Sequence, residues 1–303
     1  MTARELPRCA AQGTAPPGRI LRVGGTALHV LREGAGPVCV LSGGLGLSWF
    51  DWDPVIPLVT PYRTVVRFDR PGYGFSAPPV AVPTAAAEAD RIRRVLDALG
   101  LHGPCTVAGH AVAGFHAEAF ARLYPERTAG LLLVDASAEE APEPPTASGL
   151  RTAAARALAA ALTAAAVPYV LGPTSRRLAW SATTLAGCDP ASAPLVRRTY
   201  RTGRVLRATL LENARYPDMA AEIHELRTRR PLPAVPVTVL AAYDGSGSRR
   251  ALHWLRRQLC LADELGARFK IVTPSGHLIM IDRPQAVASA LLDPGIPLGR
   301  ART

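Results

Sequence analysis

The stretch that most constrains the fold runs from Cys105 to Gly114, where an apolar run of strand type ends at Gly109 and a helical pattern begins at once. A strand that turns abruptly into a helix needs strained backbone angles and close contact between the two, and both requirements favour glycine and other small residues. Ala111 lies at the centre of this turn. The stretch therefore predicts a buried strand, a tight turn with Ala111 at its apex, and a helix that begins immediately.

Apolar runs of strand type alternate with amphipathic helical patterns along much of the chain. The expected strands are, in order, 20–23, 27–32, 38–41, 64–68, 105–108, 130–134, 235–242 and 268–272. The clearest helical pattern covers 84–99, with Thr84 as its cap and Gly100 at its end. Continuous apolar strands separated by amphipathic helices predict an α/β fold: a mostly parallel, eight-stranded sheet with helices on both faces.

The alternation stops between residues 136 and 230, where helical patterns occupy 150–166, 194–214 and 219–229 and no convincing strand occurs. We interpret this segment as a helical cap inserted into the sheet. The predicted organisation is a flexible N-terminal arm at 1–19, a core formed by 20–135 and 231–303, and the cap at 136–230. The leucines, alanines and Trp180 of the cap favour an apolar, fairly bulky small-molecule substrate.

Charge and composition argue against several classes of partner. The formal net charge is +11, but Lys270 is the only lysine and the arginines form no block along the sequence, so we expect no nucleic-acid partner. The five cysteines include no Cys-x-x-Cys pair, which argues against a metal site. A phosphate-cradling loop and a dinucleotide fingerprint are also missing, so we expect no cofactor. The oligomeric state stays open.

The N-terminal and alanine-rich segments bear on the cellular location of the protein. Residues 1–19 contain no apolar run of the kind that a signal peptide needs. The segment 153–170 is only moderately hydrophobic and Arg156 interrupts it, which is typical of a helix packed on a partner helix. We therefore expect a cytoplasmic protein without a membrane partner.

Four motifs occur in the order in which the α/β-hydrolase family carries them. They are Ser42-Gly43-Gly44 after a strand, Asp69 to Ser76 as a glycine-rich turn, Gly109 to Gly114, and Ser275-Gly276-His277 followed by Asp282-Arg283-Pro284. They resemble the family's His-Gly-x oxyanion turn, its D-x-x-G-x-G-x-S turn, its G-x-S-x-G nucleophile elbow and its final Gly-His loop. The resemblance covers residues 25 to 292 and implies the α/β-hydrolase sheet.

This resemblance implies a catalytic site in which the nucleophile is missing. Ala111 occupies the position of the serine, and a methyl group cannot attack a carbonyl. His277 occupies the position of the base. The backbone N–H groups of Gly44 and Val112 occupy the positions of the oxyanion donors. We also expect Gly43, His110 and Trp180 to contribute to the substrate site.

Two acids compete to orient His277. Asp244 follows the strand 235–242, the commoner family location, but its Ala-Tyr-Asp-Gly setting departs from the usual Gly-x-x-Asp spacing. Asp135 follows the strand 130–134, the location used in some family members. We favour Asp135 and expect at least one of the two to face His277.

Three hypotheses fit the alanine at the elbow. In the first, the chain is an ester, thioester or lactone hydrolase whose serine was changed to Ala111 by an experimenter, so that its hydrolytic activity is absent or very low. In the second, Ala111 is natural, and a His–Asp dyad beside an oxyanion hole performs proton-transfer chemistry as a cyclase, dehydratase, lyase or cofactor-free oxygenase. In the third, the chain is a catalytically dead ligand-binding protein. The retained Gly-His loop argues against the third hypothesis.

Overall fold

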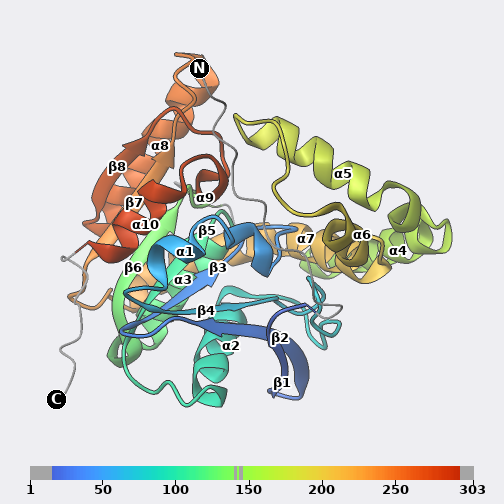
Figure 1. The fold of residues 1–303 in the computed structure, drawn as a ribbon, viewed down its shortest axis with the longest axis horizontal. Helices are drawn as coiled ribbons and strands as arrows, with labels where there is room; N and C mark the ends of the chain where they lie inside the picture. Colours follow the sequence, from blue (N-terminus) through green and yellow to red (C-terminus); the bar gives the residue numbers. More distant parts are fainter. Residues whose placement is uncertain (1–15, 140–141, 143–145, 294–303) are drawn as a thin grey trace, which may run out of the picture.

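The computed structural model describes residues 16–139, 142 and 146–293. Its strands form one eight-stranded sheet in the order β1-β2-β4-β3-β5-β6-β7-β8 (Figure 1). The strands are β1 (Arg19–Val23), β2 (Thr26–Glu33), β3 (Val38–Ser42), β4 (Thr64–Phe68), β5 (Cys105–His110), β6 (Thr128–Val134), β7 (Val237–Ala242) and β8 (Arg268–Val272). β1 pairs antiparallel with β2, and β2 with β4; every other pairing is parallel. The predicted fold class is confirmed.

The two antiparallel strands form the hairpin expected at Gly24-Gly25. Both glycines have positive φ, 55° and 82°, which glycine adopts without a steric penalty. The predicted N-terminal arm at 1–19 lies outside the described residues except for its last four positions, and β1 already includes Arg19.

Helices cover both faces of the sheet because successive strand residues point to opposite sides. On one face lie α2 (Ala85–Ala98), α3 (Ala113–Leu123), α8 (Arg249–Leu265) and the second half of α7 (Gly203–Arg229). On the other face lie the 3₁₀ helix η1 (Trp49–Trp52), α1 (Ile56–Val59), α9 (Ile279–Asp282) and α10 (Pro284–Leu292). A further 3₁₀ helix, η2 (Pro125–Arg127), links α3 to β6.

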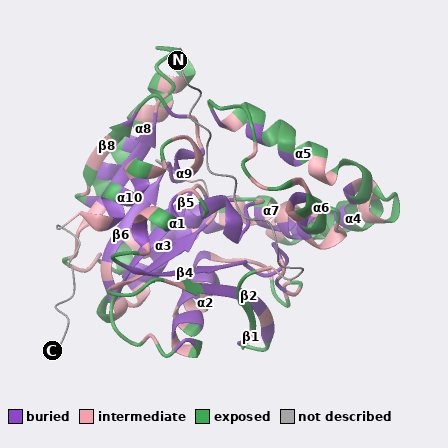
Figure 2. Cartoon of the chain, viewed as in Figure 1, coloured by how far each residue is buried: buried purple, intermediate pink, exposed green. Residues whose placement is uncertain are grey.

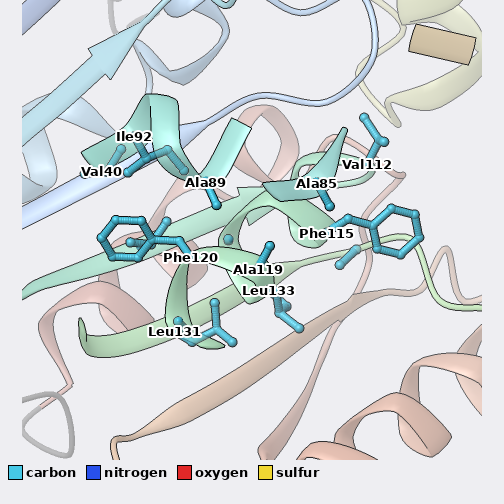
Figure 3. Close-up of a cluster of buried hydrophobic side chains, with 14 of the residues drawn as sticks. Val40, Ala85, Ala89, Ile92, Val112, Phe115, Ala119, Phe120, Leu131 and Leu133 are labelled. Atoms are coloured by element: carbon cyan, nitrogen blue, oxygen red, sulfur yellow. The ribbon is translucent and has the colours of Figure 1, made fainter. Parts of the chain in front are cut away.

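The core beneath the central strands is apolar and closely packed. Figure 3 shows Phe115 and Phe120 of α3 among the strand residues Leu131 and Leu133 and the α2 residue Ile92, all of them buried. Burial of each large side chain contributes roughly 1.5–3 kcal/mol relative to its exposure to water. The α2 helix forms where its apolar stripe predicts, and the Thr84 hydroxyl caps it by accepting the N–H of Ala87 at 3.1 Å. This core holds β5 and α3 in fixed positions.

Four helices, called here the inserted helices, lie between β6 and β7. They are α4 (Ser148–Ala164), α5 (Val167–Thr183), α6 (Ala193–Tyr200) and α7. α4, α5 and α6 project away from the sheet, and Figure 2 shows how much of their surface is exposed. The division of the chain into a core and a cap stays a prediction.

The prediction for this region was wrong in three places. α5 lies where no helix is expected, because its buried residues (Pro168, Arg176 and Trp180) do not form the apolar stripe of an amphipathic helix. The helix expected at 194–214 is interrupted at Arg201 and Thr202, between α6 and α7. In contrast, Pro217 lies inside α7, which runs without a break through the gap expected at 215–218.

Among the described residues, no single helix combines the length and the hydropathy needed to cross a bilayer. α4 and α5 meet that test only when they are taken together, and their axes are bent by 106° at the short break between them.

Candidate active site

The elbow follows β5 directly and has the geometry that its small residues predict. Ala111 has a φ of 50°, the left-handed region that costs an L-residue about 1–2 kcal/mol. A Cβ at Gly109 would collide with the carbonyl of Ala113, and one at Gly114 would lie 2.6 Å from the Cβ of Ala136. The two glycines therefore allow the helix to leave the strand at once, with Ala111 at the apex.

A second left-handed residue lies beside the elbow. His110 pairs with Val134 in the sheet, so Ala111 and Asp135 follow the same edge of two neighbouring parallel strands. Asp135 has a φ of 43° and is buried. This backbone places the carboxylate of Asp135 next to the loop that follows β8.

His277 and Asp135 form a close pair. The Nδ1 atom of His277 lies 2.6 Å from Oδ2 of Asp135. The other oxygen, Oδ1, accepts the N–H of Ala242 and the indole N–H of Trp254, each at 2.8 Å. An ionised Asp135 accepts the Nδ1 proton, which leaves the lone pair of His277 on Nε2. The imidazole is therefore oriented as a base, and its side chain is partly exposed.

The loop that carries His277 is held by a residue of the same motif. The carboxylate of Asp282 accepts the N–H of Gly276 at 2.7 Å and also the N–H of Leu185 at 3.0 Å. The N–H of Ser275 donates to the carbonyl of Tyr243 at 2.9 Å. The sequence Ser-Gly-His…Asp thus positions His277 through its own backbone.

Asp244, the competing acid, is not brought to His277. Its carboxylate is exposed and accepts the N–H of Ser246 at 2.8 Å, a hydrogen bond that lowers the pKa of Asp244. Asp244 lies on the rim of a cavity of about 670 Å³ that His277, Asp135 and Trp254 also line. The geometry assigns the contact with His277 to Asp135.

His110 lies beneath His277. Its ring centroid is 4.6 Å from that of His277, and its Nε2 lies 3.0 Å from the His277 carbonyl oxygen. Burial, together with the nearby His277, lowers the pKa of His110 well below its usual value, so the ring is neutral. His110 is buried between His277 and Gly44, and its contribution to the substrate site stays a prediction.

The turn from Ser42 to Gly46 borders the elbow on the other side. A Cβ at Gly44 would lie 2.9 Å from the Cβ of Ala111, so only a glycine backbone fits there. The guanidinium of Arg70 donates to the carbonyl of Gly43 and, at 3.0 Å, to that of Gly44. Because the peptide is planar, the Gly43 carbonyl directs the N–H of Gly44 away from Arg70. Within the described residues, neither this N–H nor that of Val112 donates a hydrogen bond.

Arg70 is in turn tied to an inserted helix. Its guanidinium lies 2.8 Å from the carboxylate of Glu212 on α7, and the hydroxyl of Tyr73 donates to the same oxygen at 2.6 Å. Burial raises the pKa of Glu212, and the Arg70 charge opposes that rise. The Asp69–Ser76 motif contains Arg70, but nothing in the sequence pattern indicated its contact with Glu212, because 142 residues separate the two. The pair links the Gly43–Gly44 turn to α7.

An apolar cavity of about 400 Å³ begins at the far end of the same turn. Leu45 and Gly46 form one wall, and residues of α5, α6 and α7, Trp180 among them, form the others. Trp180 lines this cavity, and its contact with a substrate stays a prediction. A pocket of this size and character suits an apolar small molecule.

Arg176 holds α5 against this cavity and was not indicated by the sequence pattern. It lies 2.6 Å from Asp51 and 2.5 Å from Asp189, and it also donates to the hydroxyl of Tyr200 at 2.7 Å. Its guanidinium carbon lies 3.6 Å from the ring centroid of Trp180. The arginine is buried and its charge is matched on both sides, so it joins α5 to η1 and to the segment before α6.

The described residues contain no group of three His, Cys, Asp or Glu side chains that could hold a metal ion.

Comparisons with known proteins agree with this geometry. A sequence profile described as the alpha/beta hydrolase family matches residues 39–290. A putative carbamate hydrolase, RutD of Azorhizobium caulinodans, is 34% identical over 113 residues, which cover 37% of this chain and 42% of that protein. The pimeloyl-[acyl-carrier protein] methyl ester esterase of Photobacterium profundum is 34% identical over 120 residues, 39% of this chain and 44% of that protein. These matches span less than half of the length of either relative.

Solved structures match over nearly the whole chain. Cfl2 of Burkholderia cenocepacia superposes with a TM-score of 0.69 at 26% identity and covers 91% of this chain and 94% of its own. The enol-lactonase of Burkholderia xenovorans superposes with a TM-score of 0.62 at 20% identity, covering 91% of this chain and 98% of its own, and so shows the shared fold alone.

Proposed function

Because the chain belongs to the alpha/beta hydrolase family, we propose that its site binds the carbonyl group of an apolar ester, thioester or lactone, with Ala111 in place of the nucleophilic serine. The observation that carries this proposal is the pairing of His277 with Asp135 at 2.6 Å beside a left-handed elbow residue. A left-handed residue at the elbow and a His–Asp pair serve acyl transfer, because a serine at the apex would have a base beside it.

Each residue has a distinct role in this proposal. A serine hydroxyl at position 111 attacks the carbonyl carbon, and Nε2 of His277 takes the hydroxyl proton while Asp135 stabilises the resulting imidazolium. The N–H groups of Gly44 and Val112 donate to the oxyanion. With Ala111 in place of the serine, only the attack on the carbonyl carbon is lost. The chain as it stands therefore binds the substrate, forms no acyl-enzyme, and hydrolyses it slowly or not at all.

The chemistry of the relatives and the shape of the cavity support the substrate class. The carbamate hydrolase and the methyl ester esterase both carry names that denote cleavage next to a carbonyl. The cavity of about 400 Å³ extends from Leu45 and Gly46, next to Gly44, and its apolar lining fits a hydrocarbon portion of the substrate.

Proton-transfer chemistry is the second candidate, and the intact pair of His277 and Asp135 beside Ala111 favours it. Without a nucleophile, Nε2 of His277 can remove a proton from a carbon next to a carbonyl, and the N–H groups of Gly44 and Val112 can stabilise the enolate. Cyclisation, elimination and oxygenation all begin with such a step. A protein that only binds its ligand has no use for a base at His277.

The experiment that tests the main proposal restores the hydroxyl. We expect Ala111→Ser to raise the hydrolysis of short and medium acyl p-nitrophenyl esters by about 10⁴-fold or more, since removal of a catalytic serine costs about 10⁶ in a well-studied case. The same variant should be labelled by a fluorophosphonate probe that leaves the alanine form unlabelled.

Two further variants make this result specific. In the Ala111→Ser background, Asp135→Asn should reduce turnover by about 10⁴-fold because it disturbs the tautomer of His277. Asp244→Asn, at the exposed competing acid, is the matched control and should leave turnover unchanged. A folded Ala111→Ser protein that is inert toward esters and probe would refute the hydrolase proposal and direct attention to proton transfer at His277.

A further inference from the structure

Large apolar side chains are exposed on the first two inserted helices. Of the fourteen strongly exposed large apolar residues in the described chain, seven lie within 36 residues: Leu150, Leu158, Tyr169, Val170, Leu171, Leu178 and Leu185. Val170, Leu171 and Leu178 share one side of α5 by their helical spacing. Val170 and Leu178 lie away from the buried Arg176 and Trp180 and form an exposed outer face of α5. Leu171 lies at the border between this outer face and the apolar cavity that Arg176 and Trp180 also line.

The inserted helices from α4 to the first third of α7 carry most of the net positive charge of the protein. Between residues 148 and 211 the chain has nine arginines and a single acid, Asp189. Arg156 on α4 and Arg177 on α5 are exposed, and so are Arg197 and Arg201 at the end of α6. Arg177 lies between Val170 and Leu178 on the outward side of α5. Apolar side chains mixed with arginines on an exposed helix are typical of surfaces that lie in the headgroup region of a bilayer.

The outer face is continuous with the apolar cavity. Leu171 lines that cavity and is also 52% exposed, so the cavity reaches the surface at α5. Its other end meets Leu45 and Gly46 in the turn beside Ala111. An apolar molecule that entered at Leu171 would thus reach Leu45 and Gly46, which belong to the same turn as Gly44.

We propose that the outer face of α5 docks on the surface of an anionic lipid bilayer. The side chains of Val170, Leu171 and Leu178 enter the boundary between headgroups and acyl chains, and the arginines contact anionic headgroups. Each arginine near such a surface contributes attraction that falls with added salt. A second copy of the chain is a poorer occupant, because two faces with the same arginines repel each other. The expectation of no membrane partner rests on the lack of a spanning segment, and a protein that lies on a bilayer needs none.

Vesicle flotation with the full chain tests this proposal. We expect the protein to float with vesicles of phosphatidylcholine and phosphatidylglycerol, to stay behind with phosphatidylcholine alone, and to lose binding as salt rises. Combined substitution of Val170→Ser, Leu171→Ser and Leu178→Ser should weaken binding by about tenfold or more, because the three side chains lose their apolar contact with the bilayer. Arg156→Gln together with Arg177→Gln should weaken binding to the anionic vesicles, because fewer arginines contact the anionic headgroups.

The α8 helix offers a matched control. Leu252 and Leu259 are exposed to a similar extent as Leu171, and Arg256 lies between them. Leu252→Ser with Leu259→Ser should leave flotation unchanged. Circular dichroism of each variant verifies that the fold is retained.

Three outcomes would overturn the proposal. They are no flotation with anionic vesicles, flotation that the α5 substitutions do not weaken, and an equal loss of flotation in the α8 control variant. A concentration-dependent dimer that the α5 substitutions dissociate, with no flotation, would assign the face to a second copy of the chain. The readout is binding, not turnover, so failure here leaves the hydrolase proposal untouched, and failure of that proposal leaves this one untouched.

Discussion

The helices α3 and α5 both border the candidate site, yet they are held in opposite ways. α3 buries ten of its eleven residues, and apolar packing against β5, β6 and α2 fixes its start next to Val112. α5 buries only three of its seventeen residues, and one of them is the charged Arg176. Close apolar packing thus fixes the position of α3, whereas a small number of directional polar contacts fixes the position of α5.

This difference separates the two tasks of the site. The elbow and its neighbours need a geometry that is accurate to a fraction of an ångström, and a close-packed core supplies it. The wall of the apolar cavity needs only to present a surface of suitable size. A helix held by few contacts can change its sequence while the elbow stays in place. Under the proposed function, such changes in α5 would alter the substrate.

The largest stability effect should come from the packed helix. Phe120→Ala should lower the free energy of unfolding by about 3–5 kcal/mol, because it leaves a cavity between α3 and the sheet. Leu178→Ala on the exposed side of α5 should change it by less than about 0.5 kcal/mol. Urea denaturation monitored by circular dichroism measures both values, and similar losses in the two variants would contradict the contrast.

Arg176→Ala tests the polar attachment of α5. We expect a loss of about 3 kcal/mol, because the carboxylate of Asp51 is left buried without its partner, while local opening of α5 lets water reach it and limits the loss. Hydrogen exchange should accelerate in α5 and stay slow in α3. Arg177→Ala, at the exposed neighbouring position, is the control. Equal acceleration in both helices would show that α5 and α3 unfold as one unit.

The smallest effect concerns pH and tests the packed helix again. Burial lowers the pKa of His116 on α3 well below its usual value, and the charges of Arg70 and Arg91 add to that shift. The unfolded chain therefore binds a proton more readily, and stability is present above about pH 6.5 and lost as pH falls below it.

His116→Leu should remove this loss, which amounts to up to about 1.4 kcal/mol per pH unit between pH 6.5 and 5. The ring nitrogens of His116 have no hydrogen-bond partner within the described residues, so the substitution by leucine removes no hydrogen bond. Urea denaturation of the two proteins across this range measures the difference. Nε2 of His116 lies 4.0 Å from Oε1 of Glu212, whose raised pKa acts in the opposite direction, so the measured difference includes any change at Glu212. A flat difference for His116→Leu would argue against a buried neutral imidazole.

The sequence predicted best the parts of the fold whose causes are local. The strand β5, the turn at Ala111 and the helix α3 follow from adjacent residues, since glycine spacing and apolar periodicity act over one or two turns of chain. The stripe and the capping Thr84 of α2 are equally local. α5 was missed because the partners of Arg176, which are Asp51 and Asp189, do not appear in any periodic pattern.

The candidate site was predictable only in part for the same reason. His277 and Ala111 occupy positions that the motifs mark. The choice between Asp135 and Asp244 depends on which strand end faces the loop after β8, and both residues follow strands. Arg70 and Glu212 act across 142 residues, and a motif that contains Arg70 gives no sign that its guanidinium holds the carbonyls of Gly43 and Gly44.

The left-handed backbone at Ala111 has a genetic consequence. Alanine and serine codons of the GCN and TCN type differ at their first base alone, so one transversion would place a hydroxyl on a main chain that already has the required shape. No second change is needed to open the turn, orient His277 or free the N–H groups beside it. If Ala111 is natural, a lineage that carries this gene therefore stands a single nucleotide from the set of residues that the proposed hydrolase needs, and drift or selection could cross that distance in either direction.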